Sequence, residues 1–246
     1  MAAGDTAWYA FVRGLVRNAF FRPLGGIKTF GEENIPGSGA VILAPTHFSL
    51  LDPPAVACGI RRQLSFMAKE ELFRGLFGKI IFSVGAFPIR RGAGDREALK
   101  LGLSRLAEGR ALLMFPEGTR GDGKRLGALN KGVGLMAKQS GCPVVPAAII
   151  GTHVMWPRGQ KKIRRHGAIL AFGPAIRFGD FMGDGPDRAA HEAFAHALRA
   201  EMLRLAAEHG LVLTSGEPES GSPSERPPAG PDATESPATS EVPGPR

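Results

Sequence analysis

Short apolar runs rich in strand-forming residues alternate with helical segments over the middle of this chain, and this alternation constrains the fold more than any other feature. Five runs predict strands, at residues 40–44, 64–68, 111–115, 144–150 and 168–172. Helical patterns separate them, as in residues 95–108, where Asp95 fits the cap and Gly109 the stop. We therefore predict one α/β domain over residues 26–214, with a mixed or parallel sheet flanked by helices.

The C-terminal part of the chain divides into a helix and a tail. Residues 187–209 predict a helix that Gly210 ends, with an apolar stripe made of Phe194, Leu198, Met202 and Leu205. Residues 215–246 hold eight of the 20 prolines and one large aliphatic residue, Val242. Such a composition buries little apolar surface, so we predict a disordered tail.

The charge of the chain is unevenly distributed. The whole sequence carries a formal charge of +8, whereas the tail holds six acidic residues and two arginines, so the first 214 residues carry about +12. A surplus of this size favours an anionic partner, which could be nucleic acid, an anionic bilayer or a phosphorylated small molecule.

Residues 7–21 predict an amphipathic helix at the N-terminus. One face is aromatic or apolar and consists of Trp8, Phe11, Leu15 and Ala19. The other face is basic and carries Arg13 and Arg17. Such a helix can lie in the headgroup region of a bilayer, so residues 1–25 are predicted to associate with a membrane. A terminal helix that covers the core would show the same pattern. The apolar segment 72–82 has the same two interpretations.

Neither a membrane span nor an oxidising compartment is expected from the sequence. The longest stretch without charge, residues 139–157, contains three prolines and several polar side chains, which disfavours a transmembrane helix. No apolar run near the start resembles a secretory signal. Cys58 and Cys142 are far apart and form no CxxC motif, so we expect neither a disulfide framework nor a zinc cage.

A polar segment with the sequence APTHFSLLDPP, residues 44–54, follows the first predicted strand. His47 and Asp52 are five residues apart and would lie on different faces of a helix, so a loop must bring them together. Pro53 fits the first turn of a following helix, and Asp52 fits its N-cap. In such a loop Asp52 can orient one imidazole nitrogen and leave the other for substrate. Taken alone, such a pair is more often a surface or capping feature.

A second polar turn, residues 115–120 with the sequence FPEGTR, also directly follows a predicted strand. Gly118 permits a tight turn with exposed N–H groups, and Arg120 offers a bidentate fork for phosphate. Glu117 can hold a hydroxyl or orient the arginine. An ordinary polar turn could have this composition, but two such segments after two strands favour a functional site.

These segments together resemble the glycerolipid acyltransferase family, whose lysophosphatidate acyltransferases carry an HxxxxD motif and an FPEGTR motif. Four blocks stand in the family's order between residues 27 and 150. They are the His47 and Asp52 pair, GAFPIRRG with Arg91, FPEGTR itself, and VVPAAI around Pro146. One departure is Thr46, which stands where many members of the family have Asn.

The resemblance implies that residues 26–214 form an acyltransferase domain. It would move a fatty acyl group from acyl-CoA or acyl-ACP, the acyl carrier protein thioester, to the sn-2 hydroxyl of 1-acylglycerol 3-phosphate, giving phosphatidate for phospholipid biosynthesis. His47 and Asp52 would be catalytic, and the residues that would bind substrate are Arg91, Glu117, Gly118, Thr119, Arg120 and Lys131. No metal, no cofactor beyond the thioester and no covalent acyl-enzyme are expected. Glycerol 3-phosphate or another lysophospholipid is the alternative acceptor.

A dense basic cluster follows Trp156 and contains Arg158, Lys161, Lys162, Arg164 and Arg165. It could bind nucleic acid, anionic lipid headgroups or the phosphates of coenzyme A, or be a solvated hairpin. Because no nucleic-acid-binding motif is present, we expect no nucleic acid and favour a peripheral position at the cytoplasmic face of the cell membrane. A non-catalytic basic module that binds membrane or nucleic acid is the alternative from another class, and it would leave the His47 and Asp52 pair unexplained.

Overall fold

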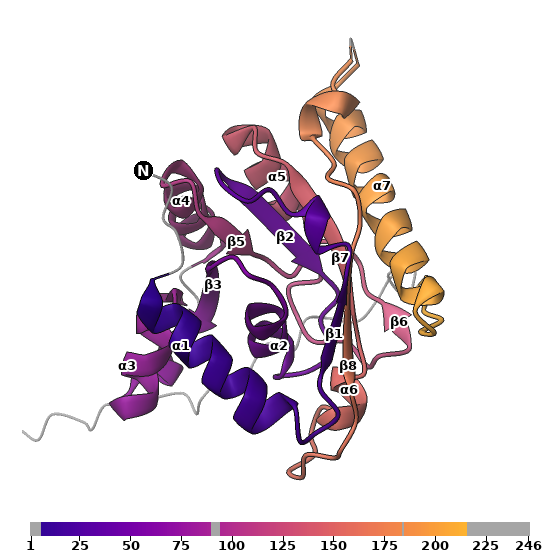
Figure 1. Ribbon diagram of the computed structural model, residues 1–246. Helices are drawn as coiled ribbons and strands as arrows, with labels where there is room; N and C mark the ends of the chain where they lie inside the picture. The colour runs from indigo at the N-terminus through magenta and orange to yellow at the C-terminus, as the bar shows by residue number, and fades with distance from the viewer. Residues whose placement is uncertain (1–5, 90–93, 184, 216–246) are drawn as a thin grey trace, which may run out of the picture.

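The structure is a computed structural model, and it describes residues 6–89, 94–183 and 185–215. Its centre is a seven-stranded sheet with helices on both faces (Figure 1). In spatial order the strands are β1 (Ile27–Phe30), β8 (Ala168–Phe172), β7 (Val144–Ile150), β2 (Val41–Pro45), β5 (Ala111–Leu113), β3 (Leu64–Lys69) and β4 (Ala86–Ile89). This confirms the predicted α/β fold with a mixed sheet.

The sheet contains strands of both directions. The five strands from β7 to β4 are mutually parallel, so their carboxyl ends lie along one edge. At the other side β8 runs antiparallel to β7, and β1 runs parallel to β8. All five predicted strands are present, and β7 and β8 have the predicted bounds. The two strands of this sheet that were not predicted, β1 and β4, are four residues long and lie at its edges, where Pro88 is tolerated.

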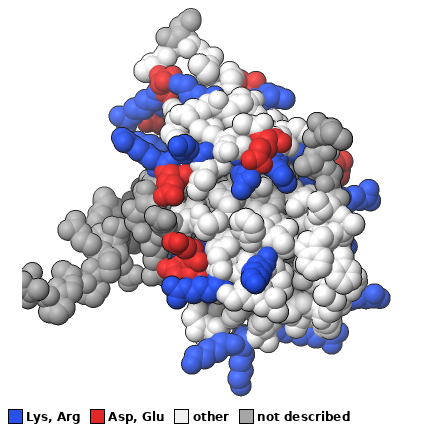
Figure 2. Space-filling model, turned by 90° about the vertical axis from the view of Figure 1, so that its left-hand side faces the viewer, with Lys and Arg blue, Asp and Glu red and all other residues white. Residues whose placement is uncertain are grey.

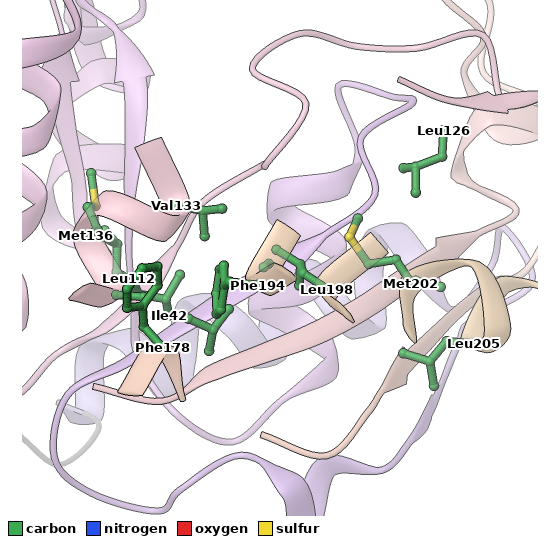
Figure 3. Close-up of a cluster of buried hydrophobic side chains, with 14 of the residues drawn as sticks. Ile42, Leu112, Leu126, Val133, Met136, Phe178, Phe194, Leu198, Met202 and Leu205 are labelled. Carbon is green, nitrogen blue, oxygen red and sulfur yellow. The ribbon is translucent and has the colours of Figure 1, made fainter. Parts of the chain in front are cut away.

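Side chains of the central strands alternate between two hydrophobic layers. Ile42 and Ala44 of β2 face a cluster formed with α4 (Gly94–Ala107), α5 (Lys131–Ser140) and α7 (Asp187–Glu208), part of which Figure 3 shows. Val41 and Leu43 face the opposite layer, against α2 (Asp52–Gly59). Both faces of the sheet are therefore buried, which explains why these strands read as continuous apolar runs.

The last long helix, α7, confirms the predicted apolar stripe. Phe194, Leu198, Met202 and Leu205 are all buried, and burial of a side chain of this size contributes about 1.5–3 kcal/mol. The helix ends before Gly210, whose positive φ of 84° suits glycine. Arg199 of α7 donates hydrogen bonds to the carbonyls of Leu126 and Gly127. The helix thereby holds the loop that follows the FPEGTR segment.

Two short strands extend this contact. Residues Arg125–Leu126 form β6 and pair in parallel with Thr214–Ser215, which form β9. The sequence predicts a disordered tail from residue 215, but Ser215 belongs to this pair. The remainder of the predicted tail, residues 216–246, lies outside the described residues.

The N-terminal segment is helical over the predicted range, as α1 (Ala7–Val16) followed by a π-helical turn (Arg17–Phe21). The two arginines of the basic face bond to the protein, although Arg17 is exposed. Arg13 donates to the carbonyls of Ile60 and Arg61, at the end of α2, and Arg17 donates to the carbonyl of Cys58. The aromatic face points outward: Trp8, Phe11 and Leu15 are 48%, 61% and 56% exposed.

A second helix extends the apolar surface of α1. Trp8 Nε1 donates to Ser83 Oγ, the last residue of α3 (Gly75–Ser83), at 2.8 Å. On α3, Leu76 and Phe77 are 75% and 61% exposed. We call the exposed apolar residues of α1 and α3 the α1–α3 face. Figure 2 shows the side of the molecule that carries these helices: uncharged residues cover much of it, with Lys, Arg and some Asp and Glu residues among them. None of the helices in the described part of the chain is long and apolar enough to cross a membrane.

Candidate active site

The polar segments singled out in the sequence meet at the carboxyl edge of the parallel strands. His47 follows β2, the FPEGTR segment follows β5, and Lys69 ends β3. Because these strands are parallel neighbours, their carboxyl ends deliver all three to one place. Ligand sites of open α/β sheets lie at this edge.

The imidazole of His47 is oriented by a carboxylate. His47 Nδ1 lies 2.9 Å from Asp52 Oδ2, which is the hydrogen bond expected from the sequence. The ring also stacks on Phe115 with 3.8 Å between the ring centroids. The side chain of His47 is 16% exposed and that of Asp52 is 1% exposed. Nδ1 is thus occupied from the protein side, and Nε2 is the nitrogen left for substrate.

Asp52 is the first residue of α2 and not its N-cap, which is Leu51. Its carboxylate turns back toward the preceding loop, where Oδ2 accepts the amides of Phe48 and Ser49 at 2.7 and 2.8 Å. The predicted cap was wrong because the carboxylate bonds to amides before the helix, not to those of its first turn. Prolines follow Asp52 at the start of the helix, as expected.

A residue that the sequence reading missed completes the contacts of Asp52. Thr152 Oγ1, at the start of α6 (Thr152–Met155), donates to Asp52 Oδ1 at 2.6 Å. Thr152 is fully buried and follows Gly151, whose φ is 89° and where an added Cβ would lie 2.1 Å from the carbonyl oxygen of Gly167. With one oxygen of Asp52 bound to Thr152, the other is directed at His47. Only the pairing of β2 with β7 brings these positions, 100 residues apart, together.

The loop of His47 and the FPEGTR segment are joined through the backbone of His47. Its N–H donates to Glu117 Oε1 at 2.9 Å, and its carbonyl accepts the N–H of Gly121 at 2.8 Å. Glu117 Oε2 accepts the N–H of Gly127 at 3.0 Å. Burial raises the pKa of the Glu117 carboxyl above its usual value, against the opposing effect of these amides. Glu117 therefore links three loops; its contact with substrate stays a prediction.

The structure explains why glycine stands at position 118 and what the threonine at position 46 does. Gly118 has a φ of 67°, and an added Cβ would lie 2.5 Å from Nδ2 of Asn130, so the tight turn expected there requires glycine. Thr46, the departure from the family motif, is fully buried and its Oγ1 accepts the N–H of Ile149 at 2.9 Å. It fastens β2 to β7 directly before His47.

A cavity of about 1430 Å³ opens beside His47. The predicted site residues that line it are His47, Gly118, Thr119, Arg120 and Lys131. Asp52 and Glu117 are buried behind them, and Arg91 lies outside the described residues. Further cations at this cavity include Lys69, Arg96 and Arg158. Lys69 and Arg96 were not predicted as site residues because neither belongs to a motif, whereas Arg158 belongs to the basic cluster for which the phosphates of coenzyme A were one expected ligand. Among the described lining residues the cations thus outnumber the acidic ones, of which Glu71 is the single example.

The rest of the cavity is apolar. Its walls come from α1, β3, α3, β5, α4 and α5, and include Val16, Phe66, Phe77, Leu99, Leu113 and Leu135. Pockets for one drug-sized ligand occupy about 300–1,000 Å³. This cavity has room for more than one ligand, with basic side chains beside His47 and largely apolar walls elsewhere. Among the described residues no group of His, Cys, Asp and Glu could hold a metal ion.

The chain is similar to known acyltransferases. Residues 26–150 match the model of the Acyltransferase family. A 1-acyl-sn-glycerol-3-phosphate acyltransferase of Bacillus subtilis (strain 168) is 31% identical over 184 residues, which are 74% of this chain and 88% of that protein. The chloroplast 1-acyl-sn-glycerol-3-phosphate acyltransferase LPAT1 of Arabidopsis thaliana is 28% identical over 66% of this chain, which spans 46% of that protein.

The fold is shared with a solved structure as well. The crystal structure of the 1-acyl-sn-glycerophosphate acyltransferase PlsC from Thermotoga maritima has a TM-score of 0.70 to this chain, with 22% identity, and the match covers 82% of this chain and 80% of that one. A histidine oriented by a carboxylate beside a cavity with several cations is an arrangement suited to acid–base chemistry on an anionic substrate. The chain belongs to the acyltransferase family, the glycerolipid acyltransferases that its motifs resemble.

Proposed function

We propose that this protein transfers a fatty acyl group from a thioester to the sn-2 hydroxyl of 1-acylglycerol 3-phosphate, giving phosphatidate for phospholipid biosynthesis. The observation that carries the proposal is the hydrogen bond between His47 and Asp52 in a cavity that combines basic side chains beside His47 with largely apolar walls. The printed names of the relatives from Bacillus subtilis and Arabidopsis thaliana support the choice of acceptor.

In this proposal His47 acts as a general base and then as a general acid. Nε2 takes the proton of the acceptor hydroxyl as its oxygen attacks the thioester carbonyl, and then gives that proton to the departing thiolate. Asp52 holds the ring and stabilises the imidazolium that forms between the two steps. Acid–base catalysis of this kind contributes about 10² to 10⁴ in rate. Holding two substrates together contributes on the order of 7–11 kcal/mol more.

Cations at the cavity would bind the phosphate of the acceptor. Arg120 and Lys131 line the cavity beside His47, and neither forms an ion pair with an acidic side chain in the described part of the chain. A guanidinium can form two parallel hydrogen bonds to a phosphate. The N–H groups of the turn at Gly118 and Thr119 would add further donors. The apolar walls would hold the acyl chains.

The α1–α3 face supports a peripheral position on a membrane, proposed here for the cytoplasmic face of the cell membrane. Its exposed aromatic and aliphatic side chains would enter the headgroup boundary, where an acceptor with a long acyl chain resides. Val12, Val16 and Phe77 belong to these helices and line the cavity, so an acyl chain could pass from the bilayer into the cavity. The donor is proposed to be acyl-CoA or acyl-ACP, without a further cofactor.

The purified protein should release free thiol from acyl-CoA in the presence of 1-acylglycerol 3-phosphate, with phosphatidate identified by mass spectrometry. His47→Ala should lower turnover about a thousandfold, because the acceptor hydroxyl loses its base. His196→Ala, at an exposed position on α7, is the matched control and should keep wild-type turnover. Undiminished turnover by His47→Ala would reject the catalytic assignment.

The same assay decides the acceptor. Glycerol 3-phosphate and lysophospholipids with other headgroups, offered in parallel, should be acylated at least tenfold more slowly than 1-acylglycerol 3-phosphate. Faster acylation of one of them would identify it as the acceptor. Absence of turnover with every acceptor, together with tight vesicle binding, would favour a non-catalytic membrane-binding module.

A further inference from the structure

The segment between α6 and β8, residues 156–167, forms a basic loop that the proposed chemistry does not use. Its five cations, Arg158, Lys161, Lys162, Arg164 and Arg165, are all exposed. The ion pairs that join described residues all lie elsewhere, so no described acidic side chain neutralises this loop. Five unneutralised charges within eight residues repel one another and favour an anionic ligand.

The basic loop is attached to both catalytic loops. At its base, the carbonyl of Trp156 accepts a hydrogen bond from Ser49 Oγ, two residues from His47, at 2.9 Å. Arg158 Nη1 donates to the carbonyl of Arg120 at 3.1 Å, and Arg158 lines the same cavity as His47. The loop therefore stands at the edge of the active-site cavity.

Internal hydrogen bonds shape the basic loop. Trp156 Nε1 donates to the carbonyl of Gln160 at 2.7 Å, and the N–H of Gln160 donates to the carbonyl of Pro157 at 3.2 Å. The N–H of Arg164 donates a hydrogen bond to the carbonyl of Met155 at 2.8 Å. These bonds fold the segment into a compact turn, so its side-chain charges are gathered over a small area.

The side chains of the basic loop favour a ligand with phosphate groups over a bilayer or a protein. Arginine forks match phosphate groups. The loop has one exposed aliphatic side chain, Ile163, whereas the apolar anchors for a bilayer lie on α1 and α3. A stable protein partner would contact about 20–30 residues on each side, more than this loop provides. A compact group of several phosphates fits it best.

We propose that the basic loop binds the phosphates of the nucleotide end of acyl-CoA, so that the thioester arm enters the cavity toward His47. This assignment rests on the proposed function, because it names the carrier of the acyl group. The loop touches none of the reacting atoms. Its contribution therefore lies in the KM for the donor and leaves kcat nearly unchanged. High salt weakens it, because the charges are exposed.

The test neutralises four cations that make no hydrogen bond to a catalytic loop, in the variant Lys161→Gln, Lys162→Gln, Arg164→Gln and Arg165→Gln. With 1-acylglycerol 3-phosphate held at saturation in detergent micelles, KM for acyl-CoA should rise about tenfold. The kcat should change less than twofold. With acyl-pantetheine, a thioester that lacks the nucleotide, the variant and the wild type should have equal kcat/KM.

A matched control removes the same number of charges outside the cavity, in Lys28→Gln, Lys100→Gln, Arg188→Gln and Arg204→Gln. It should keep the wild-type KM for acyl-CoA. If the KM for acyl-CoA rose as much in this control as in the loop variant, the effect would come from net charge alone, and the assignment would be overturned.

Other occupants give different results. If the loop variant lost kcat/KM equally with acyl-CoA and with acyl-pantetheine, the basic loop would not bind the nucleotide. Loss of activity with acyl-ACP alone would assign the loop to an acidic carrier protein. Weaker binding to anionic vesicles with an unchanged KM for acyl-CoA would assign it to a membrane. Each of these outcomes overturns the proposal.

A binding measurement separates this proposal from the proposed function. Adenosine 3′,5′-bisphosphate, titrated into the wild type without any acceptor, should bind at least tenfold more tightly than to the loop variant. Equal binding would refute the basic loop as a nucleotide site even if lysophosphatidate is acylated. Tighter binding by the wild type without turnover of any acceptor would instead refute the proposed function.

Discussion

His47 is held by hydrogen bonds to its backbone as well as by the hydrogen bond to its ring. Asp52 fixes Nδ1, while Glu117 and Gly121 bond to the N–H and carbonyl of the same residue. Loss of a buried acceptor leaves a donor unsatisfied, which costs about 1–3 kcal/mol. The precision of the site thus depends on residues that need not touch substrate.

Glu117→Gln tests this dependence. The amide of Gln offers one acceptor oxygen for the two N–H groups of His47 and Gly127, so turnover should fall about tenfold or more. Measurement of kcat on protein with wild-type circular dichroism checks this. Unchanged kcat would show that the link from Glu117 to His47 does not position the base.

The same variant should change how stability depends on pH. Because burial raises the pKa of Glu117 above its usual 4.5, the folded protein binds this proton more tightly than the unfolded chain does. The free energy of unfolding of the wild type should therefore fall as pH rises from about 4.5 through the raised pKa. In Glu117→Gln this decrease should be absent. Denaturant titrations across that pH range measure the difference, and identical profiles would contradict it.

At the scale of a single element, the structure shows which face of α1 packs on the protein and which face is exposed. The sequence allowed either a membrane-facing helix or one that covers the core. The helix packs on α2 through Arg13 and Arg17, whose hydrogen bonds to carbonyls at the end of α2 also suit the negative end of a helix dipole. The aromatic face is consequently left exposed beside α3.

Substitution of two side chains on this face should weaken binding to vesicles. Phe11→Ser with Leu15→Ser removes apolar area that would be buried in the bilayer, about 1.5–3 kcal/mol for each side chain if fully buried. Vesicle affinity should fall at least tenfold in sedimentation assays, and the melting temperature should stay within about 2 °C because both residues are exposed. Val212→Ser, at a residue that is 81% exposed and outside the α1–α3 face, is the control. Unchanged sedimentation would reject this face as the membrane contact.

At the scale of the whole molecule, the C-terminal residues of the described chain support the catalytic region. The pairing of β9 with β6 and the bonds from Arg199 act on residues 124–127, of which Gly127 bonds to Glu117. Leu213, directly before β9, is buried in the same core cluster as Leu126. Packing at the far end of the chain therefore reaches the loop that positions His47.

Two truncations test this arrangement. Removal of residues 216–246 should leave turnover and melting temperature nearly unchanged, because their composition buries little. Removal of residues 211–246 also deletes β9 and Leu213, so it should lower the melting temperature by several degrees and reduce turnover. Calorimetry and the thiol-release assay measure both. An equal effect of the two truncations would show that β9 contributes nothing.

The sequence by itself determined the elements and the chemistry of the two motifs. Strands buried on both faces are continuous apolar runs, and the stripe of α7 recurs at helical spacing, so local pattern was sufficient for these parts. His47 and Asp52 were found because they are five residues apart and their loop closes locally. Prediction failed for the edge strands β1 and β4, whose short length leaves little pattern to detect.

Only the tertiary structure decided which distant groups share the site. Thr152 reaches Asp52, Lys69 joins the cavity, and the basic loop stands at its edge because parallel strands bring their carboxyl ends to one side of the sheet. The same holds for the outward face of α1, since both of its faces could have packed inward. Such contacts depend on strand order and register, which form between segments far apart in the chain and leave no periodic signal in it.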